Sequence, residues 1–72
     1  MFRYRAVKMI NIEGHICYGL LAENLINGSW QPAAFVSDVS CNEQFVLSLA
    51  AKCIAGQLDP IHIRDVVIDA IS

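Results

Sequence analysis

The N-terminal third of the chain alternates apolar and polar positions in the way that β-strands require. Residues 2–10 set apolar side chains against Arg3 and Arg5, and residues 15–22 repeat the alternation. A period of two predicts strands, and Gly14 between them can adopt the positive φ of a tight turn. We therefore expect an antiparallel hairpin.

The turn position assigns the residues of this hairpin to faces. A turn at Glu13-Gly14, or a four-residue loop in its place, gives one grouping of the two strands. The face expected to lie under the helices carries Val7, Met9, Ile16, Tyr18, Leu20 and Ala22. The opposite face carries Phe2, Tyr4, Ala6, Ile10, Cys17 and Leu21, so both faces are substantially apolar.

Residues 23–32 are the least regular stretch. Asn27-Gly28 is a strong turn signal, and Pro32 confines any strand there to an edge of the sheet. A short third strand is expected at Ala33–Val36.

Two helices are predicted after the strands. Ser40 and Glu43 match a capping box, so the first helix should begin there, end near Ala55 and have Gly56 as a left-handed C-cap. Its inward stripe is Val46, Leu49, Ala50 and Cys53, with Phe45 and Ile54 at the margins.

Asp59 and Pro60 are a good N-cap and first residue for a second helix. Its expected core stripe is Ile63, Val66, Val67, Ala70 and Ile71. The sequence thus predicts one α+β domain over residues 1–72, in the order β-β-β-α-α, with both helices on one face of the sheet.

Composition narrows the class of protein. The 72 residues are 56% hydrophobic and 17% charged, which excludes a disordered chain. A net charge of −2 with five Lys and Arg residues argues against a nucleic-acid partner. No apolar run suits a membrane span and no signal peptide is evident, so a cytoplasmic location is expected. A chain this small is marginally stable alone, and its apolar surplus predicts a homodimer.

Three segments resemble a family of small bacterial proteins. They are Tyr18-Gly19, Phe35–Ser40 and Pro60–Asp69, the last reading Pro-Ile-His-Ile-Arg-Asp-Val-Val-Ile-Asp. The family comes mostly from spore-forming Gram-positive bacteria and carries a domain of unknown function. This chain departs from the family pattern in the stretch Asn24–Gln31 and at Ala70. The resemblance supports the architecture and implies no activity.

His62, Asp65 and Asp69 are the best candidates for chemistry, because positions i, i+3 and i+7 share one side of a helix. They could hold a divalent cation, or Asp65 could orient His62 as a general base. No further metal ligand is suggested by spacing, and we interpret the three as a solvated or interfacial surface.

The remaining candidates are a cysteine, a histidine and a tryptophan. Cys41, expected at the first position of a helix, could be a reactive thiol, but no base is placed beside it by the sequence. His15 and Cys17 lie on one strand face and are too few for a metal site. Trp30 is either a lid over the sheet edge or an exposed anchor for a partner.

Three hypotheses of function remain open. The first is a non-enzymatic interaction or regulatory module that self-associates, without cofactor or metal, with Trp30, His62, Asp65 and Asp69 as interaction candidates. The second is a sensor for a small ligand, whose pocket would need the seam between two chains. The third is an enzyme that uses His62 with Asp65, or Cys41.

Overall fold

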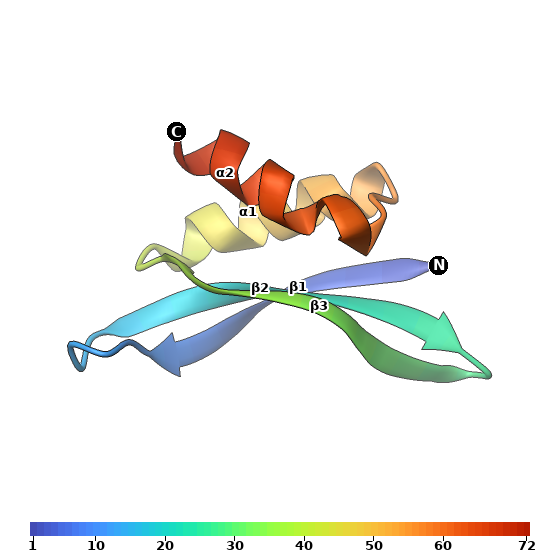
Figure 1. Cartoon of the computed structure of the whole chain (residues 1–72), viewed down its shortest axis with the longest axis horizontal. Helices are drawn as coiled ribbons and strands as arrows, with labels where there is room; N and C mark the ends of the chain where they lie inside the picture. Colours follow the sequence, from blue (N-terminus) through green and yellow to red (C-terminus); the bar gives the residue numbers. More distant parts are fainter.

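The computed structural model describes all 72 residues as one three-stranded antiparallel sheet with helices on one face (Figure 1). The strand order is β1-β2-β3. In chain order the elements are β1 (Phe2–Ile10), β2 (Ile16–Ile26), β3 (Ser29–Ser40), α1 (Glu43–Ala55), the short 3-10 helix η1 (Pro60–His62) and α2 (Ile63–Ile71). The predicted α+β class and β-β-β-α-α order are confirmed. Neither helix has the length and apolar character that crossing a bilayer requires.

The second hairpin has the predicted turn and longer strands than predicted. Asn27 and Gly28 both have positive φ, 51° and 81°, and they join the paired residues Ile26 and Ser29. This is the two-residue turn whose twist matches that of the flanking strands. The tight turn lets pairing continue on both sides of it, so β3 extends well beyond the expected Ala33–Val36.

The first hairpin has a register that reverses the predicted faces. Tyr4 pairs with Ala22, and Met9 pairs with Cys17. The connecting loop spans five residues, Asn11–His15, rather than two or four, and an odd count shifts the pairing by one residue. A shift of one moves every side chain of one strand to the other face relative to its neighbour.

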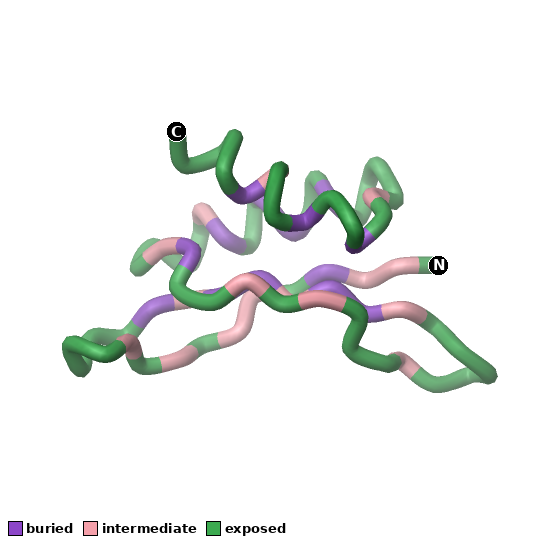
Figure 2. The backbone as a smooth tube through the Cα atoms, in the orientation of Figure 1, coloured by how far each residue is buried: buried purple, intermediate pink, exposed green.

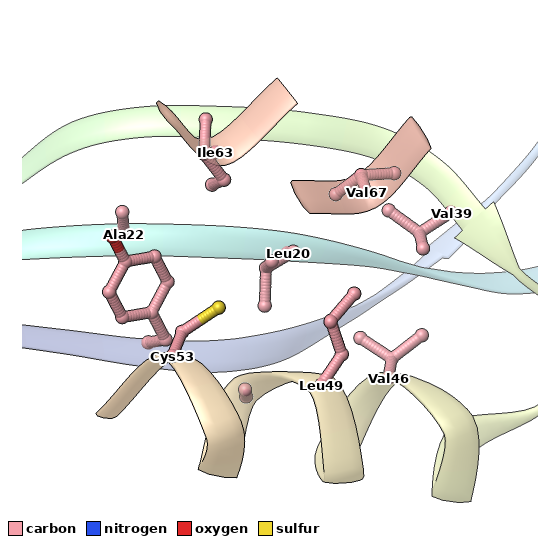
Figure 3. Close-up of a cluster of buried hydrophobic side chains, with 10 residues drawn as sticks. Leu20, Ala22, Val39, Val46, Leu49, Cys53, Ile63 and Val67 are labelled. Atoms are coloured by element: carbon pink, nitrogen blue, oxygen red, sulfur yellow. The ribbon is translucent and has the colours of Figure 1, made fainter. Parts of the chain in front are cut away.

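Side chains on the face of the sheet that lies under the helices form the core (Figure 3). Tyr4, Leu20 and Ala22 from the sheet pack with both helices, and Phe2, Ala6 and Tyr18 lie beside them. The assignment of Phe2, Tyr4 and Ala6 to an uncovered face was therefore wrong. All four residues of the predicted α1 stripe are buried, whereas α2 buries only Ile63 and Val67 of its five. Most buried positions lie where the sheet and the helices face each other (Figure 2). The buried residues of this core are Tyr4, Leu20, Ala22, Val39, Val46, Leu49, Ala50, Cys53, Ile63 and Val67.

The caps of α1 differ from those predicted. Ser40 is paired with Tyr18 in the sheet, so the strand uses the residue expected to cap the helix. Asn42 is the N-cap instead, and its side chain accepts a hydrogen bond from the Phe45 N–H at 3.3 Å. At the other end Gly56 is right-handed, and Gln57 adopts the positive φ of 46°. The predicted N-cap, Ser40, was therefore wrong, since the N-cap lies two residues later. The predicted left-handed residue, Gly56, was also wrong, since that conformation occurs one residue later.

Asn42→Ala should therefore destabilise the protein by about 1 kcal/mol, because the Phe45 N–H loses its partner. Urea unfolding followed by circular dichroism measures this cost. Asn42→Asp restores a capping acceptor and is the control, which should keep most of the stability. Equal losses in the two variants would contradict the assignment of Asn42.

A hydrogen bond from Tyr4 of β1 links the sheet to the loop between α1 and η1. The Tyr4 hydroxyl donates this bond to the Leu58 carbonyl oxygen. Burial, with smaller contributions from Cys53 and Asp59, raises the pKa of Tyr4 from 10.0 to about 12. The folded protein thus favours the neutral phenol, and the unfolded chain ionises at lower pH.

Tyr4→Phe should cost about 1 kcal/mol at neutral pH through the lost hydrogen bond. The stability that Tyr4 contributes is complete below pH 10 and falls as the pH rises toward 12, because the pKa is raised in the folded state. Unfolding free energies of both proteins across this range should therefore converge at high pH. A constant difference would show that Tyr4 titrates alike in both states.

Candidate functional site

The face of the sheet turned away from the helices is uncovered, and we call it the open sheet face (Figure 1). Its residues follow from the pairing, since directly opposed residues share a face. They are Arg3, Arg5, Val7 and Met9 of β1, Cys17, Gly19, Leu21, Glu23 and Leu25 of β2, and Trp30, Pro32 and Phe35 of β3. Both hairpin ends bend away from the helices in Figure 1, so this face is concave along the strands.

The middle of the open sheet face is apolar and built around a glycine. Val7, Met9 and Leu21 are half-buried, and the Phe35 side chain is 46% exposed. A Cβ on Gly19 would lie 2.8 Å from the Phe35 ring and 2.7 Å from the Val36 carbonyl oxygen. The absence of a side chain at Gly19 therefore lets the Phe35 ring lie against the central strand β2.

A charged cluster lies beside this apolar area, toward the β2–β3 hairpin. Glu23 Oε1 is 3.0 Å from Arg3 Nη2 and 3.1 Å from Arg5 Nε. The Glu23 side chain is only 7% exposed, so its charge needs these partners. Two guanidinium groups against one carboxylate leave a net positive charge on this part of the face.

Trp30 belongs to the same cluster. The Arg3 guanidinium carbon lies 4.4 Å from the centre of the Trp30 ring, which is cation–π distance. Trp30 pairs with Leu25 across the hairpin and is half-buried. Arg3 thus holds the Trp30 side chain on the open sheet face. This position is neither of the two that the sequence suggested, a lid over the sheet edge or an exposed anchor.

The other interaction candidates lie elsewhere. Asp65 and Asp69 are exposed on α2, and His62 is the last residue of η1, also exposed. No hydrogen bond or ion pair joins the three side chains, and no group of three metal-ligating residues is present in the structure. The structure therefore places the three side chains on the solvent side of η1 and α2, where they do not form a site together.

Cys41 precedes the N-cap of α1 rather than opening the helix. Cys41 follows Ser40, so it lies beside the Tyr18 end of β2. The residues just before His62 lie beside Asn24, at the other end of β2. Six residues of strand separate the two ends, which is about 20 Å. His62 is thus too far away to act as a base for this thiol.

Two depressions occur on the surface. The larger, about 550 Å³, is open and lies between the strand ends and η1. Its lining is Phe2, Asn24, Ala33, Ala34, Asp59, Pro60 and Ile61. Asp59 Oδ1 already accepts from the Ile61 N–H. A smaller one of about 190 Å³ lies between the helices, beside Leu49, Cys53 and Val66.

No protein-family model, curated protein or solved structure matches this chain. The resemblance to proteins of spore-forming bacteria stays a prediction.

Sequence reasoning missed the Arg3–Glu23–Arg5 cluster. Glu23 lay in the stretch that looked irregular, and its partners are 18 and 20 residues away in sequence. Arg3, Arg5 and Glu23 are all at odd-numbered positions, which places them on one face once the hairpin register is known. The predicted register put Glu23 on the face opposite the two arginines.

Glu23→Gln should destabilise the protein by about 1–2 kcal/mol, because two guanidinium groups lose a buried charged acceptor. Urea unfolding at neutral pH measures the change. Glu13→Gln, at the exposed tip of the first hairpin, removes the same charge without an ion pair and should change stability by less than about 0.5 kcal/mol. Similar losses in both variants would contradict a role for the cluster.

Proposed function

We propose that this chain is a non-enzymatic interaction module that self-associates by packing its open sheet face on that of a second copy. The observation that carries the proposal is the asymmetry of the sheet. One face is packed under two helices, and the other has half-exposed apolar residues around Gly19 and Phe35 with no layer over them.

The accessible surface of the chain is slightly above that of a compact monomer of its mass. Only 14 of 72 residues are buried, and the accessible surface is 4719 Å². A compact monomer of 8.0 kDa would expose about 4450 Å². A second layer is what most antiparallel sheets use to bury an apolar face, and another copy supplies a layer with the same apolar residues.

The distribution of charge favours the same arrangement. The apolar residues Val7, Met9 and Leu21 lie toward the first hairpin, and the Arg3–Glu23–Arg5 cluster lies toward the second. A two-fold axis that crosses the strands near Gly19 brings the apolar areas together and keeps the two positive clusters apart. Symmetric dimers of this kind are the commonest closed assemblies.

The test is the solution mass at micromolar concentration, measured by sedimentation. The expected mass is twice the 8.0 kDa of the chain, and Phe35→Glu should raise the dissociation constant at least about tenfold. Ile68→Glu places the same charge on α2, where the side chain is 52% exposed, and should leave the mass unchanged. Circular dichroism checks that both variants fold.

A monomeric wild-type chain with unfolding independent of concentration would overturn the proposal. Dissociation by Ile68→Glu and not by Phe35→Glu would also overturn it, because the interface would then lie on the helices.

A further inference from the structure

Two cysteines lie just beyond the last residues paired between β2 and β3, at the end of the sheet nearest the first hairpin. Tyr18 and Ser40 are directly opposed across β2 and β3, so Cys17 and Cys41 are the next residues outward. Opposed residues of antiparallel strands have Cα atoms about 4.5–5.5 Å apart, and disulfides form at about 4.4–6.8 Å. Both thiols are free in the structure.

We propose that Cys17 and Cys41 form a thiol–disulfide site that a hydroperoxide oxidises within one chain. The bond would join β2 to the segment between β3 and α1. The bond needs the residues of one chain alone, so it does not rest on the proposed self-association.

The two thiols have different surroundings, which sets the order of the reaction. Cys41 is exposed, whereas Cys17 is fully buried beside the Asp38 carboxylate. Burial and Asp38 raise the pKa of the Cys17 thiol, so Cys17 keeps its proton and reacts poorly with an oxidant in solution. Cys41 is the thiol that a peroxide can reach first.

The chemistry balances with hydrogen peroxide as the oxidant. The Cys41 thiolate attacks one peroxide oxygen, the O–O bond breaks, and the departing hydroxide takes a proton to give water and a sulfenic acid. Cys17 sulfur then attacks the Cys41 sulfur, the S–O bond breaks, and the hydroxide leaves as water with the Cys17 proton. Two thiols lose two electrons and two protons, and one peroxide becomes two waters.

The third cysteine is excluded by the fold. Cys53 lies on α1 in the core on the helix side of the sheet, while Cys17 lies on the open sheet face. The sheet itself separates the two thiols. Cys53 therefore provides an internal control.

The experiment treats the reduced full chain with hydrogen peroxide, blocks free thiols by alkylation, and maps the products by mass spectrometry. Cleavage after glutamate separates residues 14–23, with Cys17, from residues 24–43, with Cys41. The expected product is these two peptides linked, lighter than their sum by two hydrogen atoms, with Cys53 alkylated. Dithiothreitol should reverse the link.

Two variants complete the test. Cys41→Ser should abolish the link, and Cys53→Ala should leave it intact; circular dichroism checks both folds. A link that includes Cys53, a link between two chains, or Cys41 oxidised to a sulfinic acid while Cys17 stays alkylatable would each overturn the proposal. None of these readouts depends on whether the chain dimerises.

Discussion

The Asn11–His15 loop is the constraint on which the rest of the structure depends. The Asn11 N–H donates to the His15 carbonyl oxygen at 2.9 Å, and Asn11 Oδ1 accepts from the N–H groups of Glu13 and His15 at 3.0 Å. Gly14 completes the turn with a φ of 83°. One asparagine side chain thereby closes an odd-numbered loop and sets the pairing of β1 with β2.

That register gives the two faces of the sheet different chemistry. It places Tyr4, Leu20 and Ala22 together under the helices, where the Tyr4 hydroxyl reaches the Leu58 carbonyl. The same register brings Glu23 opposite Arg3 on the other face, where the carboxylate is held by two arginines. With a shift of one residue Tyr4 would leave the core and Glu23 would lose its position opposite Arg3, so the core and the ion cluster are consequences of one loop.

The parts of the fold that local chemistry specifies could be predicted from the sequence. The Asn27-Gly28 turn and the α1 stripe depend on residues close together in the chain, and both are confirmed. Asp59 and Pro60 do begin helical structure, but as the short η1, and α2 itself begins at Ile63. The faces of β1 and β2 could not be predicted, because alternation gives each strand two faces and only the loop count relates them. Ser40 was misassigned for a related reason, since its pairing with Tyr18 outweighs its capping potential.

The candidate site was predicted in part. Both faces of the sheet were expected to be apolar, and the open one is. It carries Leu21 as predicted, but Val7 and Met9 stand in place of Phe2, Tyr4 and Ala6. The cluster around Glu23 depends on three positions that only the folded sheet brings together. Long-range pairing of this kind leaves little trace in local composition.

The irregularities of β3 have a consequence for the edge of the sheet that this strand forms. Pro32 has no N–H, Ala33 has no partner on β2, and residues 37–39 lie opposite Gly19 alone. A strand from another molecule can add to an edge only where donors and acceptors repeat regularly along it. The longest strand of this sheet is thus interrupted twice, which makes it a poor template for edge-to-edge growth into aggregates.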